Sequence, residues 1–314
     1  MWIGGVSVAV ASLILGWLKA SDSPPRRLLD PIELPPAGRL VLPRELGSLK
    51  LAVMGDFGRG DRLQYETAEE LTRWHDRFDF DLVLLLGDNI YGTGSTEDYR
   101  TKFEVPYKTL IDRGVTFRAV PGNHDPDNIT SYPPFNMNGE RYYAFDRSAG
   151  PPWAKQRIVF VGLDTVRMDR TELTWLEAQL RSEADWTIAF LHYPLYSSGR
   201  YWFRASRTRA SLETLFVNGG VDVAFSGHEH LYERTVPQRG IQYFTSGGGG
   251  TVRVGDLRPT SATANGFDQD THFMLVEIAG DKMHFQVINR LGATVDFGVI
   301  PRSAEARRPT LLHR

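Results

Sequence analysis

The run Leu82-Val83-Leu84-Leu85-Leu86-Gly87-Asp88-Asn89-Ile90-Tyr91 passes directly from apolar residues to a glycine and a carboxylate. A short apolar stretch that ends at glycine is typical of a strand buried on both faces. The glycine lets the backbone turn sharply and leaves room for close approach. Ligands of open α/β sheets bind beyond the carboxyl ends of the strands, so Asp88 and Tyr91 become candidate site residues.

Four further segments repeat this arrangement of an apolar strand followed by polar side chains. The polar residues that follow those strands are, in chain order, Asp56, Asn123 with His124, His192, and His228 with His230. Each segment alone would be read as a common turn or a structural histidine. Five such segments in one chain instead predict that their polar groups meet at one edge of the sheet.

The donor chemistry of these side chains points to metal ions. They offer carboxylate, amide, phenol and imidazole groups, which suit Mg, Mn, Fe or Zn better than copper(I). The set is too large for a single ion with about four to six ligands, and a carboxylate can bridge two ions. Two neighbouring metal ions form a clamp suited to in-line displacement at phosphorus. The residues therefore predict a two-metal centre that acts on phosphate esters.

Composition excludes several other chemistries. The 314-residue chain has no Cys, which rules out disulfides, thiolate nucleophiles and Cys-ligated metals. Its formal net charge of −2 gives no reason to expect nucleic acid as a partner. A hydrophobic fraction of 41% is that of a globular protein.

The N-terminal part differs from the rest of the chain. Residues 2–18 carry no charge and would span roughly 25 Å as a helix, slightly less than the ~30 Å core of a membrane. We expect residues 1–20 to be a signal peptide or membrane anchor, with a buried N-terminal helix as the alternative. This predicts an extracytoplasmic protein that is secreted, periplasmic or attached to the membrane through residues 2–18.

A proline-rich linker is expected at 21–47, followed by a catalytic domain at 48–300 and a tail at 301–314. Within the domain, strands alternate with helices up to Gly240, and the remainder reads as antiparallel strands. Helices are expected at 62–78, 97–111, 171–181 and about 206–216. The pattern predicts a single α/β domain.

In this order, the five segments resemble the calcineurin-like metallophosphoesterases and, within them, the purple acid phosphatases. The resemblance runs from about residue 49 to residue 298. Most of the wider superfamily has a metal-binding His where Gly58 stands here, whereas the purple enzymes have a Tyr at the position of Tyr91. The resemblance implies a four-layer α/β/β/α sandwich with two mixed β-sheets.

The resemblance also implies roles for individual residues. The implied Fe(III) ligands are Asp56, Tyr91, His230 and the bridging Asp88. The implied ligands of the divalent ion (Fe, Zn or Mn) are Asn123, His192, His228 and the same Asp88. His124 would contact the phosphate and help the leaving group depart, with Asn123 also near the substrate. A metal-bound hydroxide would attack phosphorus.

One departure from the family concerns the substrate side. Mammalian-type members carry a second substrate-side His after the position of His192, and residues 199–204 contain none. Tyr201 or a nearby arginine is the candidate replacement. The arginines and aromatics of 200–209 could line a substrate pocket or contact nucleic acid, or form a solvated helix start.

The expected function is hydrolysis of phosphomonoesters, on a phosphorylated small molecule or protein. Two alternatives remain open on the sequence. One is a phosphodiesterase or nucleotide pyrophosphatase that uses the same metals. The other is a non-catalytic surface binding protein on a decayed phosphatase fold.

Overall fold

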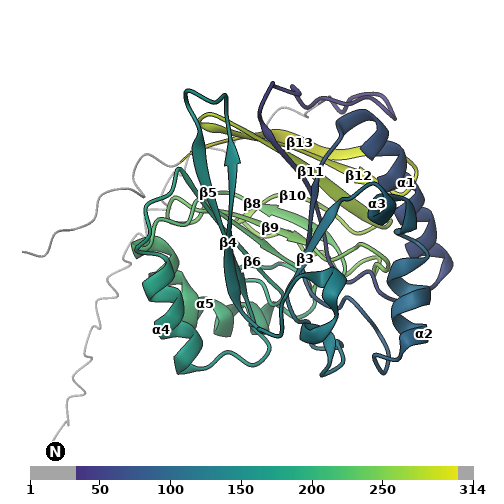
Figure 1. Ribbon diagram of the computed structural model, residues 1–314, viewed down its shortest axis with the longest axis horizontal. Coiled ribbons are helices and arrows are strands. Elements are labelled where there is room, and N and C mark those ends of the chain that lie inside the picture. The colour runs from purple at the N-terminus through teal and green to yellow at the C-terminus, as the bar shows by residue number, and fades with distance from the viewer. Residues whose placement is uncertain (1–32, 303–314) are drawn as a thin grey trace, which may run out of the picture. The chain divides into compact units, whose positions relative to one another are not determined.

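The computed structural model describes residues 33–302, where two β-sheets pack against each other between layers of helices (Figure 1). The predicted signal or anchor segment, and the tail after residue 302, lie outside this range. No helix of residues 33–302 is both long enough and apolar enough to cross a membrane.

The first sheet has six strands in the order β13-β12-β11-β1-β2-β3. Their bounds are β1 Leu49–Met54, β2 Leu82–Leu85, β3 Thr116–Ala119, β11 His272–Ala279, β12 Lys282–Asn289 and β13 Thr294–Pro301. Strands β1, β2 and β3 run parallel, and β11 pairs antiparallel with β1. The carboxyl ends of the three parallel strands therefore meet at one edge of this sheet.

The second sheet has seven strands in the order β10-β8-β9-β7-β6-β5-β4. Their bounds are β4 Tyr143–Ala149, β5 Gln156–Leu163, β6 Trp186–Leu191, β7 Val223–Ser226, β8 Tyr232–Thr235, β9 Gln242–Ser246 and β10 Thr263–Phe267. Strands β5, β6, β7 and β9 are parallel, and the outer strands pair antiparallel. Both sheets are mixed, as predicted.

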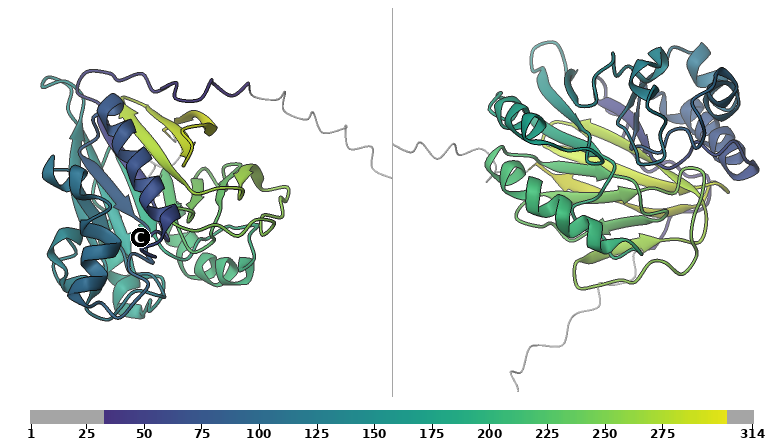
Figure 2. Two further views of the ribbon diagram at one scale, coloured as in Figure 1. Left: turned by 90° about the vertical axis from the view of Figure 1, so that its right-hand side faces the viewer. Right: turned by 90° about the horizontal axis from the view of Figure 1, so that it is seen from below.

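Three apolar cores separate the four layers. Alternate residues of a strand point to opposite faces of its sheet, so Leu51 and Val53 of β1 face the core between the sheets. Ala52 and Met54 face the core under α1 (Arg62–Phe78). A third core lies between the second sheet, α4 (Arg170–Gln179) and α5 (Trp202–Asn218). Figure 2 shows α1 across one sheet and α4 and α5 beside the other. The predicted four-layer sandwich is confirmed.

Helix α1 has the bounds that the sequence predicts. The side chain of Asp61 caps it by accepting a hydrogen bond from the backbone N–H of Gln64, and Asp79 ends it in a left-handed conformation. Its apolar positions, which include Leu71, Trp74 and Phe78, are fully buried against the first sheet.

The helix predicted over 97–111 is instead broken into three pieces, α2 (Thr96–Tyr99), the π-helix η1 (Arg100–Glu104) and α3 (Lys108–Asp112). Pro106 lies in the gap, where it has no backbone N–H to donate to the helix, although Val105 before it keeps a helical conformation. The remaining short helices are the 3₁₀ turns η2 (Ile129–Ser131) and η3 (Pro133–Phe135).

Two features of the second sheet differ from the sequence prediction. Strands β4, β8 and β10 were not predicted, because charged or small polar residues interrupt their apolar pattern. The first strand after Gly240, β9, is parallel to β7 and belongs to the second sheet, so the C-terminal part is not uniformly antiparallel.

The end of the predicted linker packs on the domain, and the compact unit begins at Leu34 instead of residue 48. Leu42 is buried in the core under α1. The buried carboxylate of Glu277 accepts hydrogen bonds from the backbone N–H groups of Arg44 and Glu45, at 2.8 and 2.6 Å. Prolines in this stretch therefore do not prevent it from docking through backbone hydrogen bonds.

Candidate metal centre

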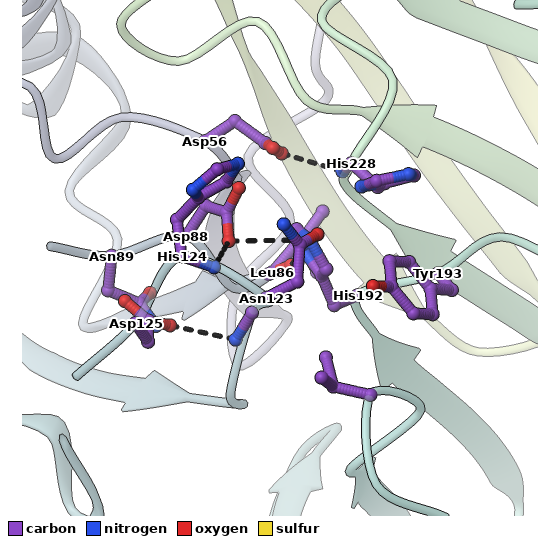
Figure 3. A network of polar contacts seen from close by, with 12 residues as sticks. Asp56, Leu86, Asp88, Asn89, Asn123, His124, Asp125, His192, Tyr193 and His228 are labelled. Atoms are coloured by element: carbon purple, nitrogen blue, oxygen red, sulfur yellow. Dashed lines mark hydrogen bonds and ion pairs between the residues drawn. The ribbon is translucent and has the colours of Figure 1, made fainter. Parts of the chain in front are cut away.

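The predicted site residues come together where the carboxyl ends of strands from both sheets meet (Figure 3). Asp56 follows β1, Asp88 and Tyr91 follow β2, and Asn123 and His124 follow β3. His192 follows β6, and His228 and His230 follow β7. Hydrogen bonds and close contacts link all eight residues into one network.

The backbone is strained at three of these residues. Asp56, Asp88 and His228 have φ angles of 57°, 51° and 71°, in the left-handed region that side chains other than glycine rarely adopt. Packing is also tight, since a Cβ added to Gly122 would lie 2.0 Å from the backbone nitrogen of Asp88. Backbone strain of this kind clusters at functional sites, where the surrounding structure holds it in place.

The carboxylate of Asp88 lies between two groups of donors and is almost completely buried. Its Oδ1 accepts the backbone N–H of His124 at 2.8 Å and lies 3.5 Å from Nε2 of His192. Its Oδ2 accepts the phenol O–H of Tyr91 at 3.0 Å. Each oxygen thus faces a different part of the cluster.

On one side of Asp88, acceptor atoms converge around His192. The carbonyl oxygen of Leu86 lies 2.9 Å from Nδ1 of His192 and can only accept, so Nδ1 carries a hydrogen and Nε2 is the ring nitrogen left for coordination. That Nε2 lies 3.0 Å from Oδ1 of Asn123. Lone pairs from an imidazole, an amide and a carboxylate therefore point at one place, where a cation would satisfy them.

On the other side, Asp56, Tyr91 and His230 meet. Oδ2 of Asp56 accepts the backbone N–H of His228 at 2.7 Å, while its Oδ1 is buried and has no hydrogen-bond partner in the described part of the chain. Nε2 of His230 lies 3.4 Å from that Oδ1 and 3.2 Å from the Tyr91 hydroxyl. Nε2 of His228 is likewise buried without a partner.

Burial sets the protonation of these groups in the absence of a cation. It is the main reason that the pKa of Asp56 is raised well above its usual value, and the charge of Asp88 raises it further. The pKa of Tyr91 is raised far beyond its usual range by burial and by Asp56 and Asp88. Burial lowers the pKa of His228 to about 2 and that of His230 to about 3. Both imidazoles are therefore neutral, with lone pairs free for coordination.

The side chains of the cluster fit metal ions. The donor atoms of Asp56, Asp88 and His192 lie within 4.8 Å of one another. The cluster contains buried oxygen and nitrogen atoms without hydrogen-bond partners among residues 33–302, carboxyl groups with raised pKa values and neutral imidazoles. A bound cation would stabilise all three kinds of group. The cluster is a metal site in its chemistry.

Asp125 holds together two of the loops that carry the cluster, a role that the sequence did not reveal. Its carboxylate accepts hydrogen bonds from the backbone N–H groups of Gly122 and Ile90, both at 2.8 Å, and from the side-chain amide of Asn89 at 2.7 Å. Burial and the charge of Asp88 raise its pKa to about 8. Asp125 thereby ties the loop after β2 to the loop after β3.

Three predicted substrate-side residues line the open side of the cluster. Asn123 and His124 are exposed, and the ring of His124 lies 5.0 Å from that of Tyr91. The ring of Tyr201 lies 5.2 Å from that of His228. The arginine-rich segment 200–209 forms the start of α5, with Trp202 and Phe203 exposed.

Sequence comparisons agree with this geometry. The model of the calcineurin-like phosphoesterase family matches residues 49–232. Purple acid phosphatase 5 of Arabidopsis thaliana is 26% identical over 202 residues, 61% of this chain but only 46% of that relative. Tartrate-resistant acid phosphatase type 5 of Rattus norvegicus is 22% identical over 301 residues, 81% of this chain and 91% of that relative.

Solved structures share the fold. A purple acid phosphatase from yellow lupin seeds has a TM-score of 0.67 at 19% identity, with 84% of this chain and 56% of that chain covered. GAP50, described as the anchor in the inner membrane complex of Plasmodium, has a TM-score of 0.72 at 17% identity, with 82% and 90% covered. The family match over most of the domain, joined to a buried cluster of metal-ligand side chains, shows that this chain belongs to the calcineurin-like phosphoesterase family and resembles its purple acid phosphatases.

Proposed function

We propose that this protein is a phosphatase that hydrolyses phosphomonoesters with two metal ions. The observation that carries the proposal is the position of Asp88, whose two oxygens face two separate groups of donor atoms. One carboxylate can thereby bridge two ions. The family match and the acid phosphatase names of several relatives support the reaction class.

The two halves of the cluster support the assignment of ligands. We assign Asp56, Tyr91 and His230 with Asp88 to an Fe(III) ion, because the anionic phenolate that Tyr91 would supply favours a trivalent metal. Asn123, His192 and His228 with Asp88 are assigned to a divalent ion, Fe, Zn or Mn. When bound, the metal ions supply the positive charge that activates water and stabilises the charge developing on the phosphate.

The exposed residues of the site are assigned to the substrate. His124 is anchored through its backbone N–H to Asp88, while its ring stands at the open side beside Tyr91. From there it can hydrogen-bond a phosphate oxygen and pass a proton to the leaving group. Asn123 and Tyr201 border the same opening.

We infer a phosphorylated small molecule or protein as the substrate, outside the cytoplasm, and no nucleic acid partner. The inferred substrate class rests on the exposed polar side chains of the site, Asn123 and His124. The location rests on the apolar residues 2–18, and the exclusion of nucleic acid rests on the net charge of −2.

Two rivals remain to be separated by experiment. A phosphodiesterase or nucleotide pyrophosphatase would use the same metals. A non-catalytic binding protein could also share the fold, which is found in GAP50, described as an anchor. Decay of the catalytic site would remove ligands, whereas all seven proposed ligands are present in this chain.

The deciding experiment compares turnover of p-nitrophenyl phosphate with that of bis(p-nitrophenyl) phosphate, on purified protein of known metal content. We expect two metal ions per chain and faster monoester hydrolysis. Diester turnover equal to or faster than monoester turnover would favour the phosphodiesterase. Two bound metals without turnover of either ester would favour the binding protein.

Asp88→Ala tests the bridge directly. Removing a carboxylate shared by both ions should release both, so elemental analysis should find less than one metal ion per chain and activity should be lost. Asp127→Ala is the matched control, since Asp127 follows Asp125 in the same loop, is exposed and forms an ion pair with Arg167. Two ions retained in the Asp88 variant would contradict the bridging role.

A further inference from the structure

Arg253 is a residue outside the sequence-predicted site that contacts one of the proposed metal ligands. It lies between β9 and β10, and its backbone N–H donates to the carbonyl of His230 at 3.2 Å. Its Nη2 lies 3.4 Å from Nε2 of His230, the nitrogen that also faces Asp56 and Tyr91. The guanidinium is thus adjacent to the proposed Fe(III) ligands.

The guanidinium interacts electrostatically with Asp56 and Glu229, but it forms no ion pair with either carboxylate in the described part of the chain. Its Nη1 is buried and has no hydrogen-bond partner within residues 33–302. Its Nη2 meets a ring nitrogen, not a carboxylate. A buried cationic N–H without an acceptor is unfavourable, and a planar guanidinium pairs best with the two oxygens of a carboxylate or phosphate.

Metal binding would sharpen this mismatch. A cation coordinated by Nε2 of His230 occupies the lone pair that Nη2 now faces. Neither terminal nitrogen of Arg253 would then have a hydrogen-bond acceptor among residues 33–302. The oxygens of an anion such as phosphate would satisfy a metal ion and a guanidinium together.

Tyr201 holds the guanidinium in this place. The Arg253 guanidinium carbon lies 5.3 Å from the centre of the Tyr201 ring, which in turn lies 5.2 Å from the ring of His228. The backbone N–H of Tyr201 donates to Oε1 of Glu229 at 2.6 Å, and Glu229 stands between His228 and His230 in the sequence. Tyr201 is therefore a positioning residue on the wall where the family's second substrate-side His is missing.

We propose that Arg253 binds the phosphate of the substrate and makes the site select monoesters over diesters. A monoester has three terminal oxygens, so one would remain for Arg253 if the metal ions engaged the other two. A diester has two, and its second ester group would have to occupy the place of the third oxygen. This inference rests on the proposed phosphatase function and names the residue that sets its substrate class.

The test uses the metal-loaded full chain with Arg253→Met, Arg253→Lys and the control Arg258→Met, which removes an exposed arginine from the same loop. Arg253→Met should lower kcat/KM for p-nitrophenyl phosphate by about 100-fold, the usual effect of losing one charge-stabilising donor. The value for bis(p-nitrophenyl) phosphate should change by less than about threefold, because that ester does not use the contact.

Inorganic phosphate provides a readout that is independent of turnover. Isothermal titration calorimetry should show its Kd rising at least tenfold in Arg253→Met, with two metal ions retained. Arg253→Lys keeps the charge without the planar fork and should recover part of the affinity. It also serves as the test variant if the Met variant does not fold.

Each result decides the proposal. Equal losses for both esters, or an unchanged phosphate Kd in Arg253→Met and Arg253→Lys, would overturn it. A wild-type protein that turns over neither ester would refute the phosphatase function, while the calorimetry would still show whether Arg253 binds phosphate.

Discussion

The hydroxyl oxygen of Tyr91 is the atom on which we expect the visible absorption of the protein to depend. Its hydroxyl contacts Asp88 and His230, and its ring contributes to the wall beside His124. Tyr91→Phe removes only the oxygen. We expect any visible absorption band of the purified protein to disappear, because that band would arise from phenolate coordinated to Fe(III), while the divalent ion stays bound.

The visible spectrum and elemental analysis check this prediction. Tyr193→Phe is the matched control, since the Tyr193 ring packs 4.5 Å from that of His228 on the other side of the cluster. An absorption band that survives in Tyr91→Phe would contradict the assignment of Tyr91 to iron.

His272 is a second residue whose environment has a measurable consequence. It is fully buried at the start of β11, and burial lowers its pKa to about 4 from an ordinary value of 6.5, with Asp270 opposing the shift. The folded protein therefore binds this proton less well than the unfolded chain. The contribution of His272 to stability is complete above pH 6.5 and is lost as the pH falls to 4, by about 3 kcal/mol.

Urea denaturation of the wild type and His272→Gln between pH 4 and 7 tests this sign. The free energy of unfolding should fall less steeply with decreasing pH in the variant, which has no titrating ring. Parallel curves for the two proteins would show that His272 does not titrate as described.

At the scale of elements, the capped helix α1 and the broken stretch 96–112 show what local sequence can decide. Asp61 caps α1 through the N–H of Gln64, and the 3.6-residue spacing of its apolar side chains matches the sheet beneath. These signals are local, so the sequence predicted the bounds of α1. The second stretch has the same spacing but contains Pro106, and a proline outweighs apolar spacing in a helix interior.

Asp61→Ala should therefore lower the free energy of unfolding by about 1 kcal/mol, the usual value of an N-cap. Asp112→Ala, which removes an exposed ion pair with Lys108, should cost no more than about 0.5 kcal/mol. Chemical denaturation of both variants measures the difference. Equal losses would mean that the cap adds nothing beyond a surface charge.

At the scale of the whole molecule, Glu277 joins the end of the proline-rich segment to the first sheet. Its two buried oxygens accept three hydrogen bonds, from the N–H groups of Arg44 and Glu45 and from the hydroxyl of Ser48. Glu277→Gln removes the charge and turns one acceptor into a donor that faces other donors. We expect a loss of about 1.5–3 kcal/mol in unfolding free energy.

Limited proteolysis adds a local readout, since residues 34–47 should be cut sooner in Glu277→Gln than in the wild type. Glu97→Gln, which alters an exposed pair with Arg100, is the control. Unchanged cleavage in this stretch would show that Glu277 does not hold it to the domain.

The sequence alone was enough to predict the fold class and to predict that eight polar residues lie close together. Each of those residues lies in the loop that follows a strand, at most six residues beyond its end, so a local pattern that marks the end of a strand also marks a position at the common edge of the sheets. Strand β2 is a continuous apolar run, and β1 and β6 are interrupted only by Lys50 and Thr187, so all three are visible without knowledge of their partners.

Only the tertiary structure decided the roles of Asp125, Arg253 and Glu277. Each acts through atoms far away in the sequence: Asp125 on the loop after β2, Arg253 on His230, and Glu277 on residues 44 and 45. A carboxylate or guanidinium looks the same in the sequence whether it is solvated or buried. A solvated and a buried group differ in whether they have a hydrogen-bond partner in the protein. The packing of distant segments decides whether that partner is present.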